Sequence, residues 1–254
     1  MSNLSDIGFP VRGEQDVNDV IMKVLENVRE IPCPRGSYYK FADASGAAIY
    51  LQANASQELI GFNPHFEGKS RRAVSLTEAI EKESSELDGA FHAWANPQNE
   101  NYETGDYPFV FDVPDFRTHN NLNFPQNCEV QLTAFASSEF GIFKSEQDYD
   151  ESQESEIKFA AKSFVPSGLF NLDADKSQPP LAFGVFTGEI KEFELKTNQL
   201  TGEKFYWFLV ETLGGEIDVV ADPKLVTVEP NIGGYLHGQF WLSGRLINEA
   251  EARA

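Results

Sequence analysis

Apolar residues near the N-terminus recur at helical spacing. They follow the first one by three, four, seven, eight and eleven positions, and are Val17, Val20, Ile21, Val24, Leu25 and Val28. This spacing places them in one stripe along a helix. Asp16 can cap its N-terminus, and Pro32 and Pro34 cannot continue it. The pattern predicts an amphipathic helix between Asp16 and Pro32, with a short strand before it at residues 7–11.

The following segment contains short runs of apolar residues that are typical of strands. Two of them flank Asp43-Ala44-Ser45-Gly46, a turn sequence that predicts a β-hairpin. The predicted strands of this half after the first helix cover residues 37–41, 47–52, 59–62, 91–95 and 109–113. Ser75 and Glu78 match a capping box. With the apolar side chains of Leu76, Ala79 and Ile80, they predict a second helix.

The C-terminal half is predicted to be β-rich. Its predicted strands cover residues 128–136, 140–144, 157–165, 183–195, 205–212, 216–221 and 234–246. The acidic residues at 148–156 predict a solvated loop, and the polar, proline-ended stretch 171–180 an internal boundary. Gly184 and Gly188 lie inside the longest strand, where glycines allow the bends of a small barrel.

These elements predict an α+β protein. It has an N-terminal mixed sheet with two helices, followed by a β-rich C-terminal half ending in a small OB-like barrel. The predicted units are an α+β domain at 1–120, a β-rich connecting region with an acidic loop at 121–180, and the barrel at 181–248.

The last unit, residues 181–248, resembles an OB-fold-like barrel. It rests on the glycine-bent first strand, the turn at Thr201-Gly202 and the succession of hairpins. OB-folds often bind single-stranded nucleic acid by stacking bases on exposed aromatic residues. The resemblance therefore implies Trp207 and Trp241 as candidate binding residues. Adjacent residues of the run Phe205-Tyr206-Trp207-Phe208 face opposite ways, so a role in the core is favoured for part of this run.

The N-terminal order of elements resembles the paired βαβββ modules of the vicinal-oxygen-chelate fold. Residues 48–54 and 90–96 align as a faint internal repeat. That family binds a metal with His, Gln or Glu on inward strand positions. The first strand here, residues 7–11, offers no such ligand, so the resemblance implies the fold without the metal.

The net charge of the chain limits the kinds of partner that are expected. The chain has 254 residues, with 20 Lys and Arg against 40 Asp and Glu, giving a net charge of −20. Acidic residues outnumber basic ones in all parts of the chain, which disfavours nucleic-acid binding. A basic protein is the partner that this charge favours. The N-terminus lacks a signal peptide and no apolar run reaches membrane length, so a cytoplasmic protein without membrane contact is expected.

Candidate ligand-binding residues form two groups. Lys69, Arg71 and Arg72 are a tight basic cluster that suggests an anion or acidic contact, although a solvated turn is favoured. The remaining candidates could share a pocket, and are His65, His92, Tyr50 and Trp94. Each histidine is more often structural than catalytic.

Known motifs for catalysis, metals and cofactors are not matched. Gly68-Lys69-Ser70 resembles the end of a P-loop, but Asn63 occupies the required glycine position. The two cysteines, Cys33 and Cys128, have no metal-type spacing. No catalytic residue, metal or cofactor is therefore predicted, and a non-catalytic protein is favoured over an enzyme.

The sequence leaves three functions open. The first is a non-catalytic binding protein with an acidic surface, for example an immunity or inhibitor protein. The second is a small-molecule-binding protein or enzyme that uses an N-terminal pocket. The third is single-stranded nucleic-acid binding by the C-terminal barrel.

Overall fold

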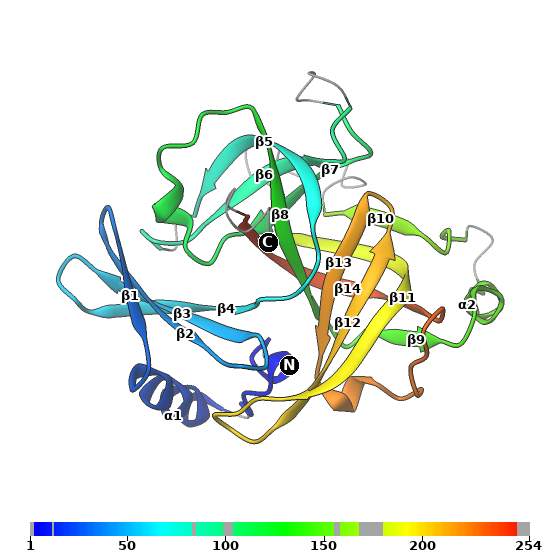
Figure 1. Ribbon diagram of the computed structural model, residues 1–254, viewed down its shortest axis with the longest axis horizontal. Coiled ribbons are helices and arrows are strands. Elements are labelled where there is room, and N and C mark those ends of the chain that lie inside the picture. The colour runs from blue at the N-terminus through cyan, green and yellow to red at the C-terminus, as the bar shows by residue number, and fades with distance from the viewer. Residues whose placement is uncertain are drawn as a thin grey trace.

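The structure is a computed structural model that describes residues 3–11, 13–82, 85–98, 104–154, 158–167 and 180–247. It confirms an α+β protein rich in strands. A four-stranded sheet lies beside a closed barrel of eight strands, and the described part of the chain contains two α-helices. Figure 1 shows the small sheet on one side of the barrel and α2 on the other.

The N-terminal hairpin was predicted correctly. The four-stranded sheet consists of β1 (Arg29–Cys33), β2 (Gly36–Ala42), β3 (Ala47–Asn54) and β4 (Leu59–Phe66), in that order. All three pairings are antiparallel. The predicted helix is present as α1 (Glu14–Leu25). It begins before Asp16 because Gly13 is its N-cap, and it ends at Leu25, before the predicted end near Pro32.

The strand predicted at residues 7–11 is wrong. Ser5–Ile7 form the 3-10 helix η1, which Gly8 ends in the left-handed conformation with φ of 78°. Ile7 and Phe9 are fully buried, as alternate residues of a strand would be. They reach the core from an irregular segment, so their spacing misled the prediction.

The helix predicted from Ser75 is also wrong. Residues Arg72–Glu81 form strand β5, which pairs with β6 (Gly89–Ala95) on one edge and with β8 (Gln126–Ala136) on the other. Backbone hydrogen bonds to two neighbours outweigh the local capping signal. The paired βαβββ arrangement required both this helix and the strand at 7–11, so the described residues do not form it.

Eight strands close the barrel. Their order is β11, β12, β13, β8, β5, β6, β7 and β14, and β14 pairs again with β11. The bounds not yet given are β7 (Pro108–Asp112), β11 (Phe183–Thr197), β12 (Lys204–Thr212), β13 (Gly215–Ala221) and β14 (Tyr235–Leu246).

A further pairing, between β8 and β14, crosses this ring. It closes a smaller ring of five strands, β11, β12, β13, β8 and β14. Four of them lie in the segment 181–248 that was predicted to form an OB-like barrel. The fifth, β8, comes from residues 126–136 and runs parallel to β13. The division into three domains therefore stays a prediction, although strand pairing connects the second and third units.

Short elements complete the fold. They are η2 (Phe116–His119), β9 (Gly141–Phe143), α2 (Glu146–Ser152), β10 (Ser163–Pro166) and η3 (Pro223–Leu225). Helix α2 corrects the predicted loop at 148–156. The Ser145 side chain accepts a hydrogen bond from the Asp148 N–H, and acidic residues in the first turn stabilise the helix dipole. The boundary predicted at 171–180 lies almost wholly outside the described residues.

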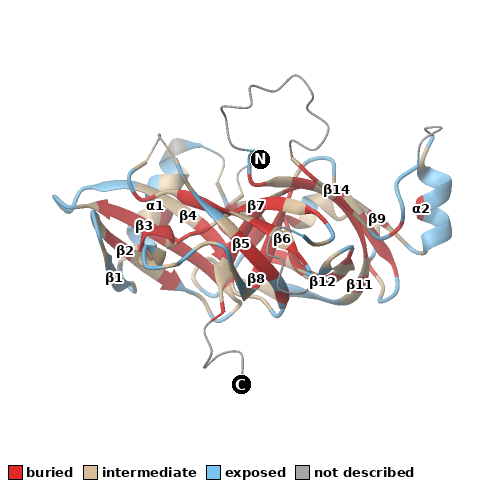
Figure 2. Cartoon of the chain, turned by 90° about the horizontal axis from the view of Figure 1, so that it is seen from above, coloured by how far each residue is buried: buried red, intermediate tan, exposed pale blue. Residues whose placement is uncertain are grey.

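Buried side chains form two main clusters. One fills the barrel and includes Phe111, Phe186 and Phe240. The other joins η1, α1 and one face of the small sheet to the outer surface of β12 and β13. Figure 2 shows buried residues along the strands of both parts and an exposed α2. Neither helix of the described chain has the length and apolar character needed to cross a bilayer.

Candidate functional site

A row of polar residues crosses the face of the small sheet that is turned away from the second cluster. Arg29 of β1 lies opposite Lys40 of β2, and Lys40 lies opposite Tyr50 of β3. Residues directly opposite one another project from the same face of a sheet. Ile49 and Leu51, the chain neighbours of Tyr50, belong to the other face and are buried in the second cluster. Strand alternation therefore sets these three side chains next to one another.

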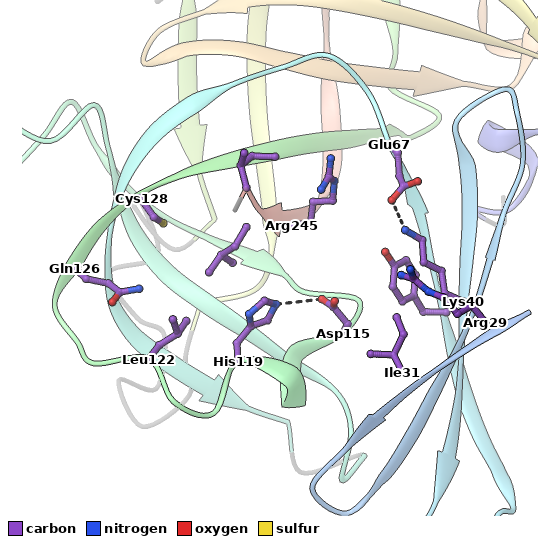
Figure 3. A pocket seen from close by; sticks show the side chains of 13 residues that line it. Arg29, Ile31, Lys40, Glu67, Asp115, His119, Leu122, Gln126, Cys128 and Arg245 are labelled. Atoms are coloured by element: carbon purple, nitrogen blue, oxygen red, sulfur yellow. Dashed lines mark hydrogen bonds and ion pairs between the residues drawn. The ribbon is translucent and has the colours of Figure 1, made fainter. Parts of the chain in front are cut away.

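This row forms one wall of a cavity of about 660 Å³ between the small sheet and the barrel. The opposite wall comes from η2, the chain after it, β8 and the end of β14. The lining residues are Arg29, Ile31, Lys40, Tyr50, Glu67, Asp115, His119, Leu122, Gln126, Cys128, Arg245, Leu246 and Ile247. Figure 3 shows Arg29, Lys40 and Glu67 on one side, and Leu122, Gln126 and Cys128 on the other. A volume of this size suits a small organic ligand.

The cavity is cationic although the protein is acidic. Three cationic side chains (Arg29, Lys40 and Arg245) and two anionic ones (Glu67 and Asp115) line it. These five side chains carry one net positive charge, in a chain whose net charge is −20. A cationic site within an acidic protein favours anions over cations as ligands.

Both acids of the cavity have partners within it. Lys40 donates to Glu67, and the His119 Nε2 atom lies 3.3 Å from Asp115 Oδ1. Burial opposes the charge on Glu67, but the Lys40 ammonium outweighs it and lowers the pKa of Glu67. Burial likewise opposes the charge on Asp115, and the contact with His119 prevails and lowers the pKa of Asp115. Both carboxylates therefore remain ionised at neutral pH.

His65 lies behind Tyr50, in the protein interior. The two rings meet edge to face with centroids 6.5 Å apart, and His65 has no exposed surface. His65 Nε2 lies 2.9 Å from Gln131 Oε1, and Nδ1 lies 2.9 Å from Ser243 Oγ. Gln131 uses its amide nitrogen to donate to Thr133 and Asp218. Its oxygen must accept, so His65 carries its proton on Nε2.

Burial determines the charge of His65. Loss of solvation lowers its pKa from 6.5 to about 4. A neutral histidine with both ring nitrogens hydrogen-bonded has no capacity left for a ligand. His65 was a predicted binding residue, and the structure gives it a structural environment next to the cavity.

His92 and Trp94 do not meet Tyr50. Both are half-buried on β6 and neither lines the cavity. The His92 Nδ1 atom lies 2.5 Å from Thr77 Oγ1 across the β5–β6 pair. Of the four residues predicted to share a pocket, only Tyr50 lines it, with His65 in contact behind.

The predicted basic cluster is divided among three environments. Lys69 lies over the Trp207 ring, 5.0 Å from its centroid, and pairs with Glu192. Arg71 is exposed and donates to the Ser70 carbonyl. Arg72 is 1% exposed and donates to Tyr107, Thr212 and the Gly215 carbonyl inside the barrel. These three side chains therefore form no common surface.

The segment that resembles a P-loop end binds an internal carboxylate. Asp218 accepts from the backbone N–H groups of Lys69 and Ser70, at 3.0 and 2.9 Å. A Cβ atom on Gly68 would lie 2.1 Å from Asp218 Cγ, so glycine is required there. The sequence did not predict a nucleotide site here. The backbone N–H groups of this segment bind the Asp218 carboxylate of the same chain instead.

The two barrel tryptophans differ in exposure. Trp207 is 3% exposed in the second cluster and donates to Asp218 at 2.7 Å. Trp241 is half-buried and donates to Asp112 at 2.8 Å. Stacking on bases needs an open ring face, which the buried Trp207 does not offer. Its position agrees with the core role favoured for this aromatic run.

The described residues contain no group of three or more His, Cys, Asp or Glu side chains placed to hold a metal ion. Cys33 and Cys128 are free and half-buried. Burial raises the pKa of Cys128, in the cavity wall, to about 12, so it stays a thiol at neutral pH. Thiolate chemistry is therefore not favoured at this wall.

Most of the cavity residues were not singled out from the sequence. Lys40 lies three residues before the turn at 43–46 and Tyr50 four residues after it, so a symmetric hairpin would pair Lys40 with Ile49 instead. The strand register pairs Lys40 with Tyr50. Asp115 and His119 lie four residues apart, at the two ends of η2. The other charged residues, Arg29, Glu67 and Arg245, come from separate elements, and no local motif connects them with η2.

No protein-family model matches the chain, and comparisons with curated proteins and with solved structures give no match.

Proposed function

We propose that the protein binds a small organic anion in the cavity between the small sheet and the barrel. One observation carries the proposal: three cationic side chains from β1, β2 and β14 converge on one cavity of a strongly acidic protein. Apolar residues, Ile31, Leu122 and Ile247, share the lining. Sites for small molecules combine such apolar walls with a few directed polar groups. This is the pocket-based function among those that the sequence leaves open.

A thermal-shift panel of small organic acids, bases and neutral compounds tests the proposal. We expect acids to raise the melting temperature, since a ligand bound only by the folded state stabilises it. Ile31→Trp should place an indole ring in the cavity and weaken the shift. Leu59→Trp is the matched control, because Leu59 is 47% exposed on β4 and lies outside the cavity. A panel in which only bases or neutral compounds bind, or in which both variants respond alike, would contradict the proposal.

A second proposal is that the acidic surface binds a basic protein, as an immunity or inhibitor protein would. It is supported by the net charge of −20 and by the exposed acids Glu146, Asp148, Asp150 and Glu151 of α2. Such binding weakens as salt rises. The test is capture of a basic protein that salt releases, with loss of capture when these four residues become Gln or Asn. Capture that salt does not disturb would argue against it.

A further inference from the structure

Tyr50 presents its hydroxyl to the cavity. The side chain is 3% exposed and lines the cavity from the middle of β3. Its contacts are made by the ring, with His65 at 6.5 Å and with the Lys40 ammonium at 5.4 Å. Within the described part of the chain, no residue forms a hydrogen bond with its hydroxyl. The fully buried polar side-chain atoms without a partner in the described chain do not include this oxygen, so the hydroxyl keeps surface that is open to the cavity. A ligand in the cavity can therefore accept a hydrogen bond from it.

This hydroxyl is a donor at neutral pH. Burial raises the pKa of Tyr50 well above its ordinary value, and the charges of Asp115 and Glu67 add to the effect. The charges of Arg245 and Arg29, which line the same cavity, act in the opposite direction. A neutral hydroxyl and the guanidinium group of Arg29 can both donate to one oxyanion.

Arg29 completes the sheet side of the site. It is the first member of the row Arg29, Lys40 and Tyr50, and its side chain is exposed at the rim of the cavity. Lys40 is engaged by Glu67. Arg29 has no ion pair with another described residue, so its guanidinium can pair with an anion without breaking an existing contact.

The charge count selects the type of anion. Among the lysine, arginine and acidic side chains of the lining, three are cationic and two anionic, an excess of one positive charge. One carboxylate would cancel it, whereas a phosphate monoester, which carries about 1.5 to 2 negative charges, would leave excess charge in a partly buried site. The count therefore favours a monoanion.

The cavity wall opposite the small sheet favours a ligand with an apolar body. Leu122 and Cys128 lie across the cavity from Arg29 and Lys40 in Figure 3. Leu246 and Ile247 add apolar lining from the end of β14. A carboxylate as small as acetate would leave most of the 660 Å³ unfilled. Burial of apolar ligand surface against this wall would contribute most of the affinity.

These observations deepen the proposed function and depend on it. We infer that the ligand is a monocarboxylate with an apolar body, and that its carboxylate accepts hydrogen bonds from the Tyr50 hydroxyl and the Arg29 guanidinium while its body packs against Leu122, Leu246 and Ile247.

Calorimetric titration of the full chain with three matched probes tests the ligand class. The probes are 2-naphthoate, the neutral 2-naphthamide and 2-naphthyl phosphate, which share one apolar body. We expect naphthoate to bind about tenfold or more tightly than the amide, because the neutral amide cannot form an ion pair with Arg29. The phosphate should also bind more weakly than naphthoate.

Three variants test the residues with naphthoate. Tyr50→Phe and Arg29→Gln should each weaken binding about tenfold. Arg71→Gln, which removes an exposed arginine outside the cavity, is the matched control and should bind as the original protein does. Tyr50→Phe should keep its melting temperature, because the lost hydroxyl has no described partner. A marked fall in its melting temperature would show that the hydroxyl serves the fold instead, and would overturn the inference.

The outcomes separate this inference from the proposed function. Equal affinity for the amide or the phosphate, or unchanged affinity of Tyr50→Phe, would overturn the carboxylate assignment. If Ile31→Trp still weakened that binding, the cavity would remain the binding site. Failure of all three probes to bind would also overturn the inference. The thermal-shift panel of organic acids would then decide whether the proposed function holds.

Discussion

At the scale of the residue, Tyr50 and His65 touch each other and yet differ in role. Tyr50 has a hydroxyl that no described residue engages, whereas both nitrogens of His65 are hydrogen-bonded. A histidine next to a turn attracts attention in a sequence because its pKa is near neutrality. Complete burial removes that property here. The contrast shows that available hydrogen-bonding capacity, and not residue type alone, distinguishes a candidate site.

His65 makes stability depend on pH. Its pKa is 6.5 in an unfolded chain and about 4 in the fold. Between these values the unfolded chain binds a proton that the folded chain does not, so the free energy of unfolding falls as pH falls. Above pH 6.5, His65 contributes its full stabilisation. The difference between the two pKa values corresponds to about 3 kcal/mol of unfolding free energy.

Urea unfolding from about pH 7 to about pH 4 measures this contribution. The raised pKa values of Asp6 and Asp112 act with the opposite sign, because burial favours their protonated forms. Both acids are also present in His65→Gln, so the difference between the two proteins isolates His65. The variant should lose less stability on acidification. Parallel pH profiles would show that His65 is not the group responsible.

At the scale of the element, the neighbouring strands determined the secondary structure of residues 72–81, against the local sequence signal. The capping box at Ser75 and Glu78 favours a helix, but β6 and β8 flank this segment and supply its backbone hydrogen bonds. In contrast, the stripe that forms α1 and the turn at 43–46 were predicted correctly. In both, the signal extends along the whole element, so tertiary contacts reinforce it.

The turn between β4 and β5 depends on Gly68. Replacing it with alanine would place a methyl group against the Asp218 carboxylate, which lies 2.1 Å from the Cβ position. We expect Gly68→Ala to cost about 3 kcal/mol, because the carboxylate must move away from four donors. Chemical denaturation measures the loss. Gly13→Ala is the control, since Gly13 has extended backbone and open space around its Cβ position. Equal small losses in the two variants would contradict the expected role of Gly68.

At the scale of the whole molecule, β8 joins parts that the sequence divides. It pairs with β5 over its first half, with β13 near its end and with β14 along its other edge. The cavity depends on the same assembly, because β8 and β14 provide one wall and the small sheet provides the other. A site of this kind exists only when segments more than a hundred residues apart meet.

The predicted barrel unit can be tested as a separate chain. We expect residues 181–248 alone not to fold cooperatively, because they lack β8 and leave β13 and β14 with open edges. Adding a peptide of residues 126–136 should restore part of the structure. Circular dichroism during thermal unfolding measures both. A cooperative transition of residues 181–248 without the peptide would show that the unit is an independent domain.

The sequence by itself determined the class of the protein and several of its elements. These elements follow from local properties: the periodicity of apolar residues along α1, the alternation in the strands and the composition of the turns. Local properties favour an element independently of its tertiary contacts. The candidate site was decided by the tertiary structure. Only the strand register placed Arg29, Lys40 and Tyr50 in one row, and only the meeting of the small sheet with β8 and β14 enclosed a cavity beside it. The physical reason is that a local pattern records which side of an element is buried, whereas the charge and shape of a cavity depend on which distant elements share it.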